Sequence, residues 1–134
     1  MREELDKFSV LVVDDEVDFV DTIIKRLRER GLDVQGEAGG KAALDLMNTK
    51  SFDICILDIK MPGMDGIETL EEMKKIDPSM EVIILTGHGS EELALRSIEL
   101  GASDHVMKPV TLDELLQRMR QVYEKKLRRR PEVK

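Results

Sequence analysis

Short apolar runs alternate with longer amphipathic stretches along the chain, and this alternation predicts five strands and five helices. The apolar runs are rich in β-branched residues and have the length of buried strands. We expect strands over 8–13, 32–37, 53–57, 81–85 and 104–107. We expect helices over 17–30, after Gly40, over 64–76, over 91–100 and from 112 to about 127. The strict alternation indicates the α/β class, with a doubly wound parallel sheet and helices on both faces.

Local signals fix several helix ends. The helix over 17–30 has an apolar face formed by Val17, Val20, Ile23, Ile24 and Leu27, and the helix after Gly40 has one formed by Ala43, Leu44 and Met47. Gly31 is expected to end the first of these helices. Thr111, with Glu114 three residues later, predicts a capping box for the last helix. Asp65 and Gly66 are predicted to form a turn and a helix entry.

Length and composition fit one globular domain. The 134 residues are 41% hydrophobic and 37% charged, which is typical of a folded protein and is enough for one core. The apolar runs are too short to cross a bilayer, and the first residues lack the apolar stretch of a signal peptide. Cys55 is the single cysteine, so it is expected to be a core residue and not half of a disulfide. Together these features predict a cytoplasmic protein.

Charge is unevenly distributed. The formal net charge is −7, yet residues 117–134 contain eight basic and two acidic side chains. The acidic remainder disfavours direct binding of nucleic acid. We interpret the basic end as solvated side chains that complement the dipole of the last helix, followed by a tail or linker remnant over 128–134.

Polar side chains follow four of the predicted strands. Asp14 and Asp15 come after the first strand, Asp58 after the third, Thr86 after the fourth and Lys108 after the fifth. Because the carboxyl ends of parallel strands lie at one edge of a sheet, these side chains are expected to converge on one shallow pocket.

Three crowded carboxylates need a cation or a proton at neutral pH, and oxygen ligands in a small open site favour Mg²⁺ over Ca²⁺. No pairing of histidine and cysteine has zinc-type spacing. Lys108 and Thr86 are explained if an anion also binds, and a phosphoryl group would supply it. A carboxylate can act as the nucleophile and form an aspartyl-phosphate.

Four motifs in order carry a resemblance to a known family. They are Val-Asp-Asp-Glu at 13–16, Leu-Asp-Ile-Lys-Met-Pro-Gly-Met-Asp-Gly at 57–66, Leu-Thr-Gly-His at 85–88 and Lys-Pro at 108–109. Over 8–127 the chain resembles the response-regulator receiver domains of two-component signalling. The resemblance implies one receiver domain over 1–134, with a core over about 8–127. It also implies a flavodoxin-like (βα)5 fold whose parallel strands have the order 2-1-3-4-5.

The resemblance implies that Asp58 accepts a phosphoryl group from a histidine kinase or a histidine phosphotransfer protein. Asp15 and Asp58 would be direct Mg²⁺ ligands together with the main-chain carbonyl of Lys60, and Asp14 would act through a water. Such a domain is a signalling phosphoacceptor and not an enzyme in the ordinary sense, although it promotes its own phosphorylation and dephosphorylation. Its partners would include a downstream protein or an output domain, and phosphorylation would allow a homodimer.

The same resemblance assigns the switch. Thr86 would move toward the phosphoryl oxygens, and the Lys108 side chain would pair with them. The peptide bond between Lys108 and Pro109 is expected to be cis. At position 105 many members of the family carry Tyr or Phe, whereas this chain has His105. A smaller, titratable ring predicts a weaker latch with a dependence on pH. Lys60 and His88 occupy positions that tune the lifetime of the phosphoryl group in relatives.

Other functions fit less well. A haloacid dehalogenase would carry a second acid two residues after the nucleophile, where this chain has Lys60. A flavodoxin would need stacking aromatics and a phosphate loop after the first strand, but aromatic residues are 3% of the chain and Asp14 and Asp15 would repel phosphate. The Gly-rich motif of P-loop nucleotidases is absent. A degenerate receiver that only binds partners is the remaining alternative, and the complete pocket set disfavours it.

Overall fold

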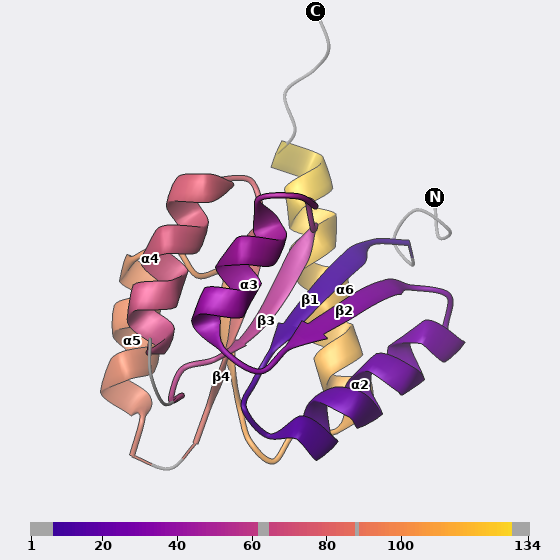
Figure 1. The fold of residues 1–134 in the computed structure, drawn as a ribbon, viewed down its shortest axis with the longest axis horizontal. Coiled ribbons are helices and arrows are strands. Elements are labelled where there is room, and N and C mark those ends of the chain that lie inside the picture. Colours follow the sequence, from indigo (N-terminus) through magenta and orange to yellow (C-terminus); the bar gives the residue numbers. More distant parts are fainter. Residues whose placement is uncertain (1–6, 62–64, 88, 130–134) are drawn as a thin grey trace, which may run out of the picture.

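A five-stranded parallel sheet forms the centre of the molecule (Figure 1). The computed structural model describes residues 7–61, 65–87 and 89–129. The strands are β1 (Ser9–Val13), β2 (Asp33–Glu37), β3 (Ile54–Asp58), β4 (Glu81–Thr86) and β5 (Asp104–Met107). Their order is β2-β1-β3-β4-β5, which confirms the predicted doubly wound topology. The helices are α2 (Val17–Glu29), α3 (Gly40–Met47), α4 (Gly66–Ile76), α5 (Glu91–Glu99) and α6 (Leu112–Arg129).

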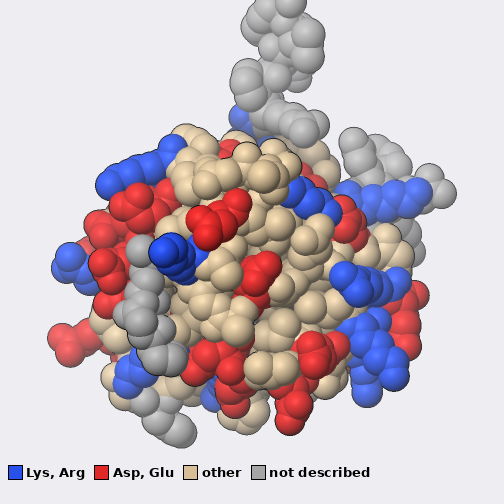
Figure 2. Space-filling model, viewed as in Figure 1, with Lys and Arg blue, Asp and Glu red and all other residues tan. Residues whose placement is uncertain are grey.

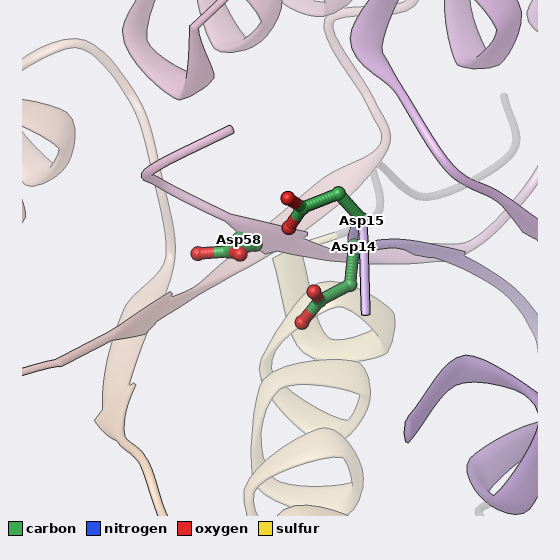
Figure 3. A group of neighbouring side chains, drawn as sticks. All are labelled: Asp14, Asp15 and Asp58. Carbon is green, nitrogen blue, oxygen red and sulfur yellow. The ribbon is translucent and has the colours of Figure 1, made fainter. Parts of the chain in front are cut away.

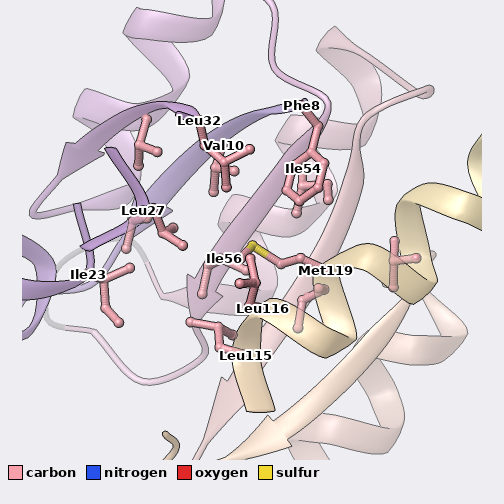
Figure 4. Close-up of a cluster of buried hydrophobic side chains, with 14 of the residues drawn as sticks. Phe8, Val10, Ile23, Leu27, Leu32, Ile54, Ile56, Leu115, Leu116 and Met119 are labelled. Atoms are coloured by element: carbon pink, nitrogen blue, oxygen red, sulfur yellow. The ribbon is translucent and has the colours of Figure 1, made fainter. Parts of the chain in front are cut away.

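The helices cover both faces of the sheet. Helices α2 and α6 pack on one face, and α3, α4 and α5 pack on the other. Successive residues of a strand point to opposite faces, so Val10 and Val12 join the first cluster while Leu11 and Val13 join the second. Figure 4 shows the first cluster, in which side chains of α2 and α6 meet those of β1 and β3. Burial on both faces explains why these strands are apolar throughout.

Two predicted helix caps are confirmed, at Gly31 and at Thr111. Gly31 has a φ of 88°, and its N–H donates to the Arg28 carbonyl while the Leu32 N–H donates to the Leu27 carbonyl. This pair of bonds is a Schellman cap, which needs a left-handed residue at the glycine. At the start of α6, the Glu114 N–H donates to Thr111 Oγ1 at 3.1 Å.

One predicted helix boundary and one predicted apolar contact differ from the structure. Val17 is 58% exposed, because it begins α2 at the edge of the sheet, where little of the sheet lies beneath the helix. Helix α6 continues through Arg129, so Arg128 and Arg129 are helical and do not belong to a tail. The expected start of a helix at Met64 lies outside the described residues, as do residues 130–134.

Two further expectations concern the core and membranes. Cys55 lies on β3 with no exposed surface, and burial raises the pKa of its thiol, so its assignment to the core is confirmed. Within the described ranges, the structure contains no helix that is long and apolar enough to cross a membrane.

Candidate functional site

The sheet register brings the polar strand ends to one edge. Val13 pairs with Leu57, and Thr86 pairs with Met107, so β1, β3, β4 and β5 end close to the same level. Asp14 and Lys108 each follow a strand, whereas Asp58 is the last residue of β3. The convergence predicted from the sequence is therefore confirmed for the acidic residues and for Lys108.

Asp14, Asp15 and Asp58 form an acidic cluster. Each offers one carboxylate oxygen, and these oxygens lie within 4.8 Å of one another. Figure 3 shows the side chains of Asp14 and Asp15 extending from the end of β1 toward the region beside Asp58. Asp14 and Asp58 are buried and Asp15 is exposed, so the cluster is open to solvent on one side. A small, open set of oxygen ligands suits a hard divalent cation.

Asp14 provides a direct test of that fit. Its Oδ1 accepts a hydrogen bond from the Glu16 N–H at 2.9 Å. Its Oδ2 is buried and pairs with Lys108 Nζ at 2.7 Å, and no further hydrogen-bond donor among the described residues reaches it. Because a carboxylate oxygen has two lone pairs, Asp14 Oδ2 can also accept from a water that a bound cation holds.

Asp58 is poised between protonation and ionisation. Burial raises the pKa of Asp58 to about 6, and the charge of Asp14 acts in the same direction. The Lys60 N–H, which donates to Asp58 Oδ1 at 3.1 Å, and the charge of Lys108 both lower the pKa. Asp58 is thus a carboxylate whose ionised form becomes more favourable when further positive charge arrives.

Lys108 is the cation that the structure itself supplies to this pocket. Its Nζ pairs with Asp14 and with Glu16, and it lies 3.7 Å from Asp58 Oδ2. Although burial alone would lower the pKa of Lys108, the hydrogen bonds and charges of these carboxylates raise it above its ordinary value. Its peptide bond to Pro109 is cis, as the resemblance implied.

Thr86 is beside the acidic cluster but turned toward β5. Its side chain is buried, and Oγ1 donates to the Val106 carbonyl at 3.4 Å. The Thr86 carbonyl accepts from the Lys108 N–H at 2.7 Å, which ties the end of β4 to the lysine segment. A threonine in this place can rotate toward a ligand on Asp58 without moving its main chain.

Three further positions were predicted to take part in the site or in the switch. The Lys60 side chain is exposed, and the predicted ligand role of its main-chain carbonyl stays a prediction. His105 is an exposed residue of β5, opposite Ile84 in the register. His88 lies outside the described residues.

Sequence reasoning missed two residues that contact Lys108. Glu16 pairs with its ammonium, and the ring of Phe19 lies 5.0 Å from it. Glu16 belongs to the motif at 13–16, so its place was visible, but a sequence does not indicate where an exposed glutamate points. Phe19 falls between the buried positions of α2, and only its distance from Lys108 reveals the contact.

Comparisons with known proteins agree with this geometry. The family model described as "Response regulator receiver domain" matches residues 10–120. Sporulation initiation phosphotransferase F of Bacillus subtilis is 38% identical over 80% of this chain and 86% of its own length. A response regulator receiver domain protein from Clostridium thermocellum has a solved structure that matches with a TM-score of 0.83 and 36% identity, over 89% of this chain and 96% of that one.

Many relatives are much longer than this chain. Transcriptional regulatory protein ZraR of Escherichia coli strain K12 is 36% identical over 82% of this chain, yet the matched part is 25% of its length. The chain therefore spans about a quarter of several curated relatives that it matches.

Proposed function

The chain belongs to the family of response regulator receiver domains, and on that premise we propose that it accepts a phosphoryl group on Asp58 with the help of Mg²⁺. The observation that supports this most is the acidic cluster with Lys108 beside it, 3.7 Å from Asp58 Oδ2. A relative of similar length is named as a phosphotransferase, which agrees with the proposal.

Asp15 and Asp58 are the proposed direct ligands of Mg²⁺, with the Lys60 carbonyl as a third, and Asp14 is proposed to act through a water. When bound, Mg²⁺ supplies positive charge that neutralises phosphoryl oxygens. The buried Oδ2 of Asp14, which pairs with the Lys108 ammonium at 2.7 Å, agrees with a site that concentrates positive charge beside Asp58.

The donor is proposed to be a phosphohistidine of a kinase or of a histidine phosphotransfer protein. The phosphorus–nitrogen bond breaks, and a carboxylate oxygen of Asp58 forms the new bond to phosphorus, so the histidine leaves with the electron pair. Lys108 pairs with the transferred oxygens, and Thr86 turns its hydroxyl from Val106 toward them. Asp58 must be ionised to attack, which a bound cation favours because it lowers the raised pKa.

Binding of beryllofluoride, a mimic of the phosphoryl group, tests the acceptor, the metal and the pocket together. Calorimetric titration of the wild type should show saturable binding that requires Mg²⁺. Asp58→Asn should abolish the binding, whereas Asp45→Asn, which changes an exposed carboxylate of α3 remote from the pocket, should not. Absence of binding by the wild type would contradict the proposed function and would favour a degenerate receiver that only binds partners.

The output of the switch is proposed to be a protein-binding face on α5 and β5. Large apolar side chains are exposed there, on Leu95, Ile98 and Met107. Rotation of the Thr86 side chain would break its hydrogen bond to the Val106 carbonyl of β5, next to the exposed Met107. The proposed occupants are a downstream protein, an output domain of a longer chain, or a second copy. We place this signalling phosphoacceptor in the cytoplasm. We assign it no direct contact with nucleic acid, because its formal net charge is −7. On the face shown in Figure 2, basic and acidic side chains are interspersed.

A further inference from the structure

Glu16 makes a contact that neither the fold nor the acidic cluster requires. Its side chain is 63% exposed, yet its carboxylate bonds the Lys108 ammonium, which is 92 positions away in the sequence. Exposed ion pairs contribute little stability, and most exposed glutamates stay solvated. The local structure around Glu16 explains why this one is directed at the lysine.

The main chain of Glu16 is fixed against the acidic cluster. Its N–H donates to Asp14 Oδ1, and its backbone is extended at the residue that precedes α2. A side chain at this position could accept a hydrogen bond from the first turn of the helix, but that of Glu16 does not. The carboxylate is directed to Lys108 instead.

Phe19, one helical turn after Glu16, makes a second contact with Lys108. Its ring centroid lies 5.0 Å from Lys108 Nζ, which is within the range of a cation–π contact. Glu16 and Phe19 together form what we term the lysine seat. With Asp14 Oδ2 at 2.7 Å and Asp58 Oδ2 at 3.7 Å, the ammonium lies nearer the chain that follows β1 than the end of β3.

We propose that Glu16 is a positioning residue, which holds Lys108 in the lysine seat and competes with the phosphoryl group for its ammonium. The inference rests on the proposed function of Asp58. A phosphoryl group on Asp58 needs the ammonium on its own side, so Lys108 must leave Glu16. Glu16 can release it at low cost because water can solvate an exposed carboxylate, whereas the buried Asp14 cannot be solvated in this way.

Replacement of the carboxylate by an amide of the same shape tests the competition. With Mg²⁺ at saturation, Glu16→Gln should bind beryllofluoride roughly two- to fivefold more tightly than the wild type, the range expected for a partly exposed ion pair. Asp18→Asn is the matched control, because it removes an exposed negative charge from the first turn of the same helix without touching the lysine seat. It should change the affinity much less.

Two further measurements separate positioning from an effect on the fold. Glu16→Ser removes the carboxylate but introduces a preferred helix cap, so it should reproduce the tighter binding without loss of stability. In metal-free protein, the nuclear magnetic resonance signals of the Lys108 side chain should show greater mobility in Glu16→Gln and no change in Asp18→Asn. That spectroscopic readout depends on neither Mg²⁺ nor phosphorylation.

The outcomes distinguish this inference from the function on which it rests. If the wild type fails to bind beryllofluoride, the proposed function fails and the inference fails with it. If the wild type binds and Glu16→Gln matches either the wild type or Asp18→Asn, the role of Glu16 alone is overturned. Unchanged Lys108 signals in Glu16→Gln would overturn it as well, since the lysine would then be held without this carboxylate.

Discussion

At the scale of single residues, the central feature is a carboxylate whose pKa is raised by its surroundings. Asp58 is buried beside Asp14, and only Lys108 and the Lys60 N–H oppose the resulting rise in its pKa to about 6. The folded protein therefore holds a proton on Asp58 more tightly than the unfolded chain does. Ionisation of Asp58 consequently costs free energy that the unfolded chain does not pay.

The stability of metal-free protein should fall as the pH rises through the window in which Asp58 ionises. Stabilisation by the bound proton is complete below about pH 4 and is lost as the pH passes about 6, because the pKa is raised in the folded state. The side chain of Asp58→Asn stays neutral at every pH. Its free energy of unfolding should exceed that of the wild type by at most about 3 kcal/mol at neutral pH and by little at pH 4. Urea unfolding with a chelator present measures this. A difference that is independent of pH would contradict the assigned environment of Asp58.

His105 offers a second test at this scale. It is exposed on β5, and a tyrosine there should form a larger aromatic latch. We expect His105→Tyr, when bound to beryllofluoride, to associate more tightly with its partner or with a second copy, because the larger ring offers more apolar surface to bury. Association measured by sedimentation provides the check. Unaltered affinity would show that this side chain is not part of the switch.

At the scale of elements, Gly66 controls how α4 meets the end of β3. A Cβ atom at Gly66 would lie 2.5 Å from the Ile59 Cα and 2.6 Å from its carbonyl oxygen, and main-chain atoms cannot yield as a flexible side chain would. The Gly66 N–H donates to that same carbonyl at 3.1 Å. The Asp65 side chain then caps α4 by accepting from the Glu68 N–H at 2.8 Å. This close approach brings the start of α4 against Ile59, the residue that follows Asp58.

Gly66→Ala should therefore lower the free energy of unfolding by about 2–3 kcal/mol, the usual range for an overpacked interior site. Gly39→Ala serves as the control, because a Cβ there meets nothing within 4 Å and the backbone is extended. It should cost less than about 1 kcal/mol, as a modest loss at a helix cap. Equal losses for the two variants in chemical denaturation would mean that Ile59 moves away freely.

Elements were the most predictable part of this protein. The period of apolar residues located all five strands to within about one residue, since burial on both faces makes each strand continuously apolar. Helix ends with explicit caps, such as Gly31 and Thr111, were equally visible. The exposure of Val17 was not, because periodicity indicates which face a residue lies on and not how far the sheet extends beneath it.

The acidic cluster was predictable for a topological reason, whereas its finer contacts were not. Parallel strands place Asp14, Asp58 and Lys108 at one edge whatever the side-chain conformations are. The contact of Glu16 with Lys108 and the bond of Thr86 to Val106 depend on rotamers that flanking residues do not determine. Those contacts are visible only in the three-dimensional structure.

At the scale of the whole molecule, an apolar face lies beside the end of the sheet that carries β5. Leu95 is 63% exposed, and Ile98 and Met107 are also exposed on this face. Such side chains gain free energy when a partner covers them, and a charge in their midst opposes burial. We propose that a partner reads the state of Asp58 on this surface.

If a second copy covers this face, beryllofluoride with Mg²⁺ should raise the mass of the wild type to that of a dimer. Leu95→Arg should then weaken the dimer tenfold or more, about 1.4 kcal/mol, because it removes apolar contact and buries a charge. Ile76→Arg is the control, since Ile76 is also exposed but lies at the end of α4 and away from this face. Light scattering across a concentration series measures both. A dimer that tolerates Leu95→Arg would have to use another surface.

The direction of α6 bears on how a receiver of this shape could serve two partners at once. Helix α6 starts just after Lys108 and Pro109, and its 18 residues span about 27 Å. Near its other end, Arg129 pairs with Glu81 at 2.9 Å and Lys126 with Asp53 at 3.7 Å, at the edge of the sheet where β3 and β4 begin. Anything joined after α6 would thus depart from the pole opposite Asp58. A phosphodonor could then bind at the pole that carries Asp58 while an attached domain occupies the opposite pole. Transfer of the phosphoryl group would not require the attached domain to move.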